Sequence, residues 1–144
     1  MMVIFYNFSK KKRYKCLGIE PSKSVAIHAT KKGIKTRVNF FGSNLAKKIK
    51  NKPSLIIANN VLAHVPDLND FIKGLSILCH QKTIISIEFP HVLNLINYNQ
   101  FDTIYHEHYS YFSVKPLKDI FKKYGLEIFN IQKLKVHGGS LRLL

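Results

Sequence analysis

The apolar run at residues 54–58 constrains the fold of this chain most, because it is uninterrupted and ends in two asparagines, Asn59 and Asn60. A strand of this kind is typically buried on both faces, as in a parallel sheet. Asp67 then stands where it would cap a helix, and apolar residues recur at helical spacing over 68–79. A buried strand that leads into an amphipathic helix is the repeating unit of α/β proteins.

The same alternation of strand and helix recurs along the whole chain. Strands are expected at 15–20, 36–40, 82–88, 126–134 and 140–144. Helices are expected at 22–32, 43–51 and 113–124. The first of these helices places Val25 and Ala29 on one face, and Gly33 and Gly125 follow two of the helices as C-terminal stops. The sequence therefore predicts one α/β domain over residues 1–144, with a mostly parallel sheet.

The charge of the chain is concentrated in its first third. The formal net charge is +15, and residues 1–52 carry fourteen Lys and Arg against one acid, Glu20. Such a patch would attract the phosphates of nucleic acid or of an anionic nucleotide substrate. The alternative, which we prefer, is a compositional bias that falls on solvated helix faces. A nucleic-acid-binding module ranks last among the functions considered, because no binding motif accompanies the charge.

The two cysteines, Cys16 and Cys79, lie far apart among apolar residues. They form no CxxC pair, so neither a disulfide framework nor a zinc site is predicted. No apolar run approaches the roughly 20 residues of a membrane span, and no signal segment is present. The expected location is a reducing cytoplasm.

Polar side chains stand where the predicted strands end. Glu20, Asn59, Asn60 and Glu88 each come at or directly after the last residue of a strand. In parallel sheets, ligands bind at the carboxyl ends of the strands. A carboxylate at the position of Glu20 can accept hydrogen bonds from the two hydroxyls of a ribose, although a surface acid in a turn is equally consistent. A glycine-rich turn should precede such a carboxylate, yet residues 1–14 contain no glycine.

The densest group of ionisable side chains is Tyr-His-Glu-His at 105–108. A histidine there would serve as a general base near neutral pH, oriented by the neighbouring tyrosine or carboxylate. Alternatively, His106 and His108 would hold a metal with His64 or His91 as a third ligand. An exposed polar loop is the remaining interpretation. His64 follows a strand directly and would face the same cleft.

Four segments together resemble landmarks of one known family, the S-adenosylmethionine-dependent sugar C-methyltransferases. They are Leu-Gly-Ile-Glu-Pro-Ser at 17–22, Ile-Ala-Asn-Asn-Val-Leu-Ala-His-Val-Pro at 57–66, Phe-Asp-Thr-Ile-Tyr-His-Glu-His at 101–108 and His-Gly-Gly-Ser-Leu-Arg at 137–142. Their order and spacing also fit this family. The resemblance implies methylation of the carbon beside the ketone of a nucleotide-linked deoxysugar.

The resemblance further implies a partial Rossmann-like class I methyltransferase fold. In this fold the first strand and its glycine-rich turn would be missing from the chain. An N-terminal zinc module and a C-terminal sugar-nucleotide domain would also be missing. The expected cofactor is S-adenosylmethionine, and the expected substrate is a nucleotide sugar. We expect no resident metal and no membrane partner.

The resemblance assigns a role to each candidate residue. Glu20, with Pro21 beside it, would bind the ribose of the cofactor. Asn59 and Asn60 would line the methionine side of the cofactor.

On the substrate side, His108 matches the family's general base. Tyr105, Glu107 and His64 would hydrogen-bond the sugar and stabilise the enolate that forms when the base removes a proton.

The absence of a glycine-rich turn leaves two alternatives to an active enzyme. The chain would be an inactive remnant, or it would be one half of a split methyltransferase that works with a separately encoded N-terminal piece. The third alternative is the basic nucleic-acid-binding module.

Overall fold

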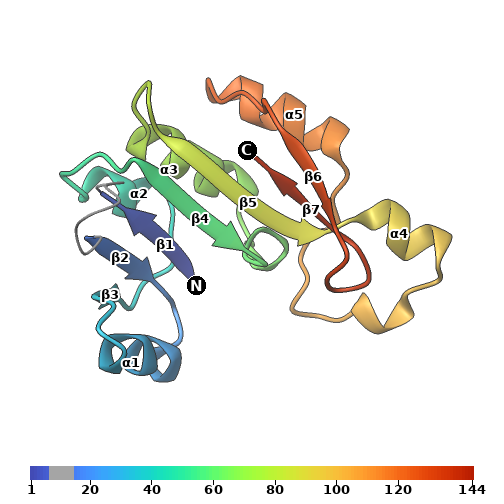
Figure 1. The fold of residues 1–144 in the computed structure, drawn as a ribbon, viewed down its shortest axis with the longest axis horizontal. Helices are drawn as coiled ribbons and strands as arrows, with labels where there is room; N and C mark the ends of the chain where they lie inside the picture. Colours follow the sequence, from blue (N-terminus) through green and yellow to red (C-terminus); the bar gives the residue numbers. More distant parts are fainter. Residues whose placement is uncertain (7–14) are drawn as a thin grey trace.

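Seven strands form one sheet in the part of the chain described by the structure, a computed structural model that covers residues 1–6 and 15–144 (Figure 1). The strands are β1 Met2–Phe5, β2 Cys16–Ile19, β3 Thr36–Arg37, β4 Leu55–Asn59, β5 Ile84–Pro90, β6 Ile131–Leu134 and β7 Ser140–Leu143. Their order across the sheet is β3-β2-β1-β4-β5-β7-β6. All the strands predicted from the sequence are present, and the predicted α/β class is confirmed.

Five of these strands run in one direction, which confirms the prediction of a mostly parallel sheet at the level of strand direction. β2 pairs parallel with β3, and β4 pairs parallel with β5. β1 and β7 run the opposite way, so every ladder that includes either of them is antiparallel. The hydrogen-bonded pairs are therefore mixed, and the sheet is less uniformly parallel than the alternation of strands and helices suggests.

One interior strand of the sheet, β1, was not predicted. It lies between β2 and β4 and is antiparallel to both, whereas the sequence analysis expected the first strand of the fold to be missing. Met-Val-Ile-Phe at residues 2–5 is apolar and has β propensity, and the free edges of two strands offer it unpaired backbone groups. Ile4 is completely buried there.

Four helices follow the predicted segments, and α2 is shorter than expected. The helices are α1 Lys23–Lys31, α2 Ser43–Lys47, α3 Leu68–Leu78, α4 Val92–Asn97 and α5 Val114–Lys123, with short 3-10 helices η1 Leu62–His64 and η2 Phe101–Thr103. The helix α4 was not predicted. In α1 the buried residues are Ala26 and Ala29, whereas Val25 is 47% exposed. No helix in the described ranges is long and apolar enough to cross a membrane.

The hydrophobic core lies on one face of the sheet. Figure 1 shows α2 and α3 behind β4 and β5, and side chains of α5 complete the same cluster. Asp67 caps α3 by accepting a hydrogen bond of 2.9 Å from the amide of Asp70, as the sequence predicted. The fully buried residues of this core include Ile56, Leu75 and Phe89.

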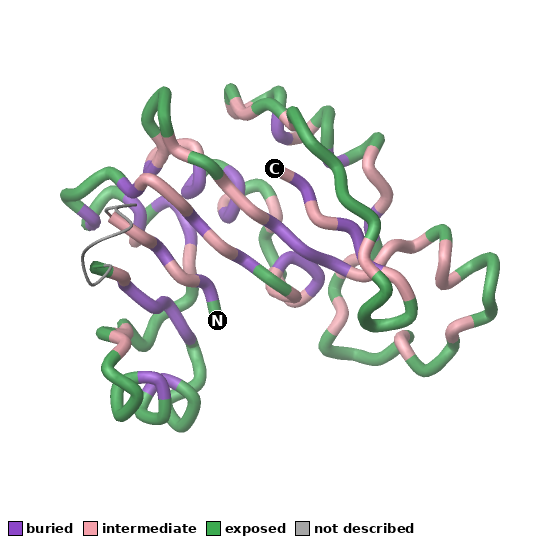
Figure 2. Tube along the Cα trace, in the orientation of Figure 1, coloured by how far each residue is buried: buried purple, intermediate pink, exposed green. Residues whose placement is uncertain are grey.

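The opposite face of the sheet is covered much less. Val3 lies beside Ile57, and Phe5 lies beside Leu55, which in turn lies beside Ile84. The first four side chains are half-buried, and Ile84 is 45% exposed. Figure 2 shows the resulting alternation of buried and less buried residues along β1 and β4. Helix α1 packs only at the end of the sheet formed by β2 and β3, so the middle of this face carries no helix among the described residues.

Candidate active site

Two cavities meet at the edge of the sheet where β2, β4 and β5 end. The first, of about 350 Å³, is lined by Glu20 and Pro21. The second, of about 380 Å³, is lined by Tyr105 and His108. Asn60 and His64 line both cavities. The structure thus brings together most of the residues predicted from the sequence, at the edge where ligands of such sheets bind.

Glu20 supplies a buried carboxylate to the first cavity. It is 7% exposed and follows β2 directly. Its Oε1 accepts a hydrogen bond of 2.9 Å from the amide of Ser22, and its Oε2 lies 3.1 Å from the amino group of Met1. An ionised carboxylate has about four lone-pair positions, so Glu20 keeps capacity to accept hydrogen bonds from a ligand hydroxyl.

Asn60 lies at the junction of the two cavities with a buried acceptor that has no partner. Its backbone has a positive φ of 52°, and its amide donates a hydrogen bond of 2.8 Å to the carbonyl of Glu88. Its side-chain Oδ1 is buried and accepts no hydrogen bond from any described residue. A buried acceptor without a donor is costly, so this atom marks a place where a ligand donor fits.

Asn59, which was expected to line the methionine side of the cofactor, lies outside both cavities. It is the last residue of β4, it is exposed, and it is not among the described residues that line either cavity. The change of backbone conformation at Asn60 separates the two neighbouring asparagines.

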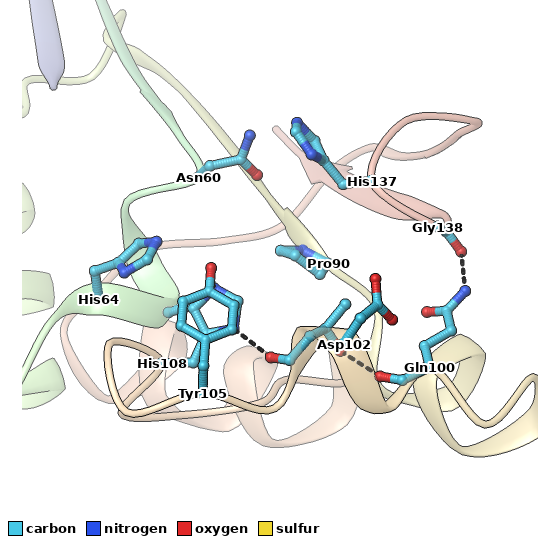
Figure 3. A pocket seen from close by; sticks show the side chains of 11 residues that line it. Asn60, His64, Pro90, Gln100, Asp102, Tyr105, His108, His137 and Gly138 are labelled. Atoms are coloured by element: carbon cyan, nitrogen blue, oxygen red, sulfur yellow. Dashed lines mark hydrogen bonds between the residues drawn. The ribbon is translucent and has the colours of Figure 1, made fainter.

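His108 is held between a carbonyl and a hydroxyl in the second cavity (Figure 3). Its Nδ1 lies 2.9 Å from the carbonyl oxygen of Thr103, and its Nε2 lies 2.8 Å from the hydroxyl of Tyr105. A carbonyl only accepts, so Nδ1 donates to Thr103, and in the neutral imidazole Nε2 accepts the hydrogen bond that Tyr105 donates. The two rings lie against one another at an interplanar angle of 34°, with centroids 4.1 Å apart. In its neutral form, this imidazole has its basic nitrogen beside a hydroxyl donor.

His64 lies next to this pair but is oriented by a different group. Its ring centroid is 4.8 Å from that of His108, and its Nδ1 donates a hydrogen bond of 3.0 Å to the backbone carbonyl of Glu107. Glu107 therefore contributes its backbone to the site. Its side chain is exposed and does not line either cavity in the described residues.

No group of three potential ligands that could hold a metal occurs among the described residues. His106 is exposed, and His91 caps α4 outside both cavities. Burial, and to a lesser extent Lys133, lowers the pKa of His91.

Four further residues line the second cavity, although the sequence analysis assigned them no role. They are Gln100, Asp102, His137 and Gly138. The last three belong to the segments 101–108 and 137–142 that carry the family resemblance, and Gln100 directly precedes the first segment. Gln100 Nε2 donates a hydrogen bond of 2.8 Å to the carbonyl of Gly138, which closes the cavity on the side away from Asn60 (Figure 3). The φ of Gly138 is 69°, a backbone conformation that favours glycine.

Glu88, which the sequence placed with the strand-end residues, has a structural role. It is buried, and its Oε2 accepts a hydrogen bond of 2.8 Å from Nη2 of Arg142 on β7. Neither residue is among those that line the two cavities. The pair joins β5 to β7.

This sheet, with an acid at the end of β2 and its cavities at the carboxyl edge, defines a Rossmann-like protein of the kind that binds nucleotide-type cofactors. A family model described as a methyltransferase domain matches residues 4–131, and the chain belongs to this family.

The chain is similar to the C-methyltransferase NovU of Streptomyces niveus. The two are 32% identical over 128 residues, which cover 87% of this chain and 30% of the relative. The chain thus spans less than a third of that protein. The family match confirms the predicted methyltransferase family, and this relative is a C-methyltransferase.

Solved structures confirm the predicted class I methyltransferase fold. The magnesium protoporphyrin IX methyltransferase of Synechocystis, solved with bound S-adenosylhomocysteine, has a TM-score of 0.67 and 15% identity, over 88% of this chain and 61% of that chain. A SAM-dependent methyltransferase of Thermotoga maritima has a TM-score of 0.64 and 16% identity, over 88% and 71%. S-adenosylmethionine is accordingly the cofactor of the family to which the chain belongs, as predicted.

Proposed function

We propose that this chain takes part in C-methylation of a nucleotide-linked deoxysugar, at the carbon beside a ketone, with His108 as the general base. The hydrogen-bonded series of Thr103 carbonyl, His108 and Tyr105 carries this proposal. It supplies a base and an electrophilic stabiliser side by side, and a carbon acid next to a ketone needs both.

The mechanism assigns a separate task to each side chain. In the structure, the Tyr105 hydroxyl and His108 Nε2 satisfy one another. A bound ketone oxygen would accept the hydrogen bond of Tyr105, which frees the Nε2 lone pair. The C–H bond beside the ketone then breaks, its proton goes to Nε2, and its electron pair forms the enolate whose oxygen Tyr105 stabilises. His64, fixed through its Nδ1, lies beside the ring of His108 at the same cavity.

The first cavity fits S-adenosylmethionine. The cofactor supplies an electrophilic methyl group when bound. Glu20 would accept from ribose hydroxyls, with Pro21 in the wall beside it. The unpartnered Oδ1 of Asn60 would accept from the ammonium of the methionine moiety. Asn59 and the carboxylate of Glu107 are left out of this proposal, because both are exposed and outside the two cavities.

Proton exchange tests the base without depending on methyl transfer. The full chain is incubated with a nucleotide-linked ketodeoxysugar in D₂O, and incorporation of deuterium beside the ketone is followed by NMR. We expect His108→Gln to lower the exchange rate by about 10²-fold or more. The control is His106→Gln, an exposed position that takes part in neither cavity. Equal exchange by His108→Gln and the unchanged chain would refute the assignment.

A second proposal is that a separately encoded piece covers the open face of the sheet and completes the enzyme. The half-buried apolar row formed by Val3, Leu55 and Ile57 supports it, because the sheets of α/β proteins bury both faces and no helix among the described residues packs on this row. Calorimetric titration with S-adenosylhomocysteine, of the chain alone and of the chain coexpressed with the coding segment directly upstream, tests it. Binding only after coexpression supports this proposal. Equal affinity for both samples contradicts it.

We also propose a cytoplasmic location. Cys16 and Cys79 are free thiols in the structure, which is the expected state in a reducing compartment. Burial, opposed in part by Lys52, raises the pKa of the Cys79 thiol to about 11, so this thiol stays protonated and poorly reactive at neutral pH.

A further inference from the structure

A cavity of about 560 Å³ lies at the opposite edge of the sheet from the active site. It is bounded by the start of β2, the start of β3 and the segment that follows α2. Its lining includes five cationic side chains: Lys15, Lys35, Arg37, Lys48 and Lys50. Its volume is in the range of small-molecule sites, which are about 300–1,000 Å³.

No carboxylate neutralises these five cations. Glu20 is the one acid in residues 1–52, and it lies at the other edge of the sheet beside the amino group of Met1. Residues 7–14, whose structure is not described, contain no acid in their sequence. The five cationic side chains form no ion pair among the described residues. The five cationic residues are exposed, so solvent screens their mutual repulsion, and a bound anion relieves what remains, most strongly at low salt.

The cavity also has an aromatic and apolar part. Tyr6 is half-buried in its wall, and the buried side chains of Leu17 and Ile49 contribute to the lining. Burial raises the pKa of Tyr6, while Arg37 opposes this effect, so its hydroxyl remains a hydrogen-bond donor at neutral pH. The side-chain amide of Asn51 adds a donor and an acceptor. Cations beside an aromatic ring are the combination that binds a phosphate together with a base.

We propose that this basic cavity binds a nucleotide, with its phosphates among the five cations and its base against Tyr6. We commit to a free nucleotide, because the described lining offers one ring, that of Tyr6, against which one base can stack. A nucleic acid strand, which stacks several bases, is the alternative that the titrations test. The site is separate from the two cavities of the proposed methyl transfer, so it stands or falls independently of that function.

Calorimetric titrations of the full chain test this site with three probes: ADP, inorganic pyrophosphate and a short oligouridylate, each at low and high salt. We expect ADP to bind saturably with one site per chain and more tightly than pyrophosphate. The combined substitution of Lys48→Glu and Lys50→Glu should weaken ADP binding by about tenfold or more, because it reverses two charges in the cavity. Tyr6→Leu should remove the advantage of ADP over pyrophosphate.

The matched control is Lys82→Glu combined with Lys115→Glu, which makes the same charge change at two exposed positions outside this cavity. Circular dichroism verifies that every variant is folded. The proposal is overturned by three results: no saturable ADP binding at low salt, an equal loss in the control variant, or length-dependent oligouridylate binding that ADP does not displace. The second result would assign the attraction to the overall charge, and the third would assign the cavity to nucleic acid.

Discussion

At the scale of single residues, the pair of Tyr105 and His108 carries the chemistry proposed for the second cavity. The carbonyl of Thr103 accepts from Nδ1, so in the neutral imidazole Nε2 is the nitrogen that accepts. In the proposed function, this pair transfers a proton at that one atom.

The hydroxyl of Tyr105 can be removed without removing its ring. Tyr105→Phe keeps the stacking on His108 but deletes the donor that would stabilise the enolate oxygen. We expect proton exchange into the ketosugar to slow by about 10²-fold, the usual cost of one such donor. Tyr109→Phe is the control. Tyr109 is 63% exposed, and its contact near the site is made by its backbone amide, which donates to the carbonyl of Ala63. A rate for Tyr105→Phe within twofold of the unchanged chain would exclude the hydroxyl from the chemistry.

At the scale of elements, the sequence predicted a helix correctly where the segment has a capping residue at its start or a glycine directly after its end. α3 has its predicted cap at Asp67, and α1 and α5 are followed by glycines with φ of 84° and 73° at Gly33 and Gly125. β1 had no such signal. Its direction and position follow from the two strand edges that it joins, 11 or more residues away in the sequence. Pairing of that kind is a tertiary effect that overrides local pattern.

The cap of α3 allows the stability contributed by one such local signal to be measured. Asp67→Ala removes the oxygen that accepts from the amide of Asp70. We expect a loss of about 1 kcal/mol in the free energy of unfolding, measured by urea denaturation. Asp119→Ala on α5 is the control, because Asp119 is exposed and not at a cap. If both variants lose the same amount, the cap contributes nothing specific.

At the scale of the whole molecule, most of the candidate site residues predicted from the sequence line the two cavities. Glu20, His64, Tyr105 and His108 each belong to a recognisable segment, and the sheet brings them to one edge. The contact of Gln100 with Gly138 was not predictable, since it spans 38 residues and depends on how β7 returns to β5. Long-range contacts of this kind are set by topology.

The one-sided core leads to a prediction for the sheet as a whole. Ile4 and Val3 are neighbours on β1, but Ile4 is completely buried on the helix-covered face and Val3 is half-buried on the open face. Ile4→Ala should therefore cost about 2–5 kcal/mol of unfolding free energy in the isolated chain, whereas Val3→Ala should cost about 1 kcal/mol or less. Urea denaturation of both variants measures the difference. If Ile4→Ala does not fold, Ile4→Val replaces it, with an expected cost of about 0.5–1.5 kcal/mol.

The comparison between the losses of unfolding free energy in Ile4→Ala and Val3→Ala tests the register of β1. Because β1 lies between β2 and β4, a shift of one residue in its register would exchange the faces of Ile4 and Val3. A larger loss for Val3→Ala than for Ile4→Ala would therefore contradict the register of β1. Equal large losses would show that the second face is also covered in the isolated chain. A partner that covers the open face would raise the cost of Val3→Ala and leave that of Ile4→Ala unchanged, so repeating the measurement with the coexpressed upstream piece locates where that piece binds.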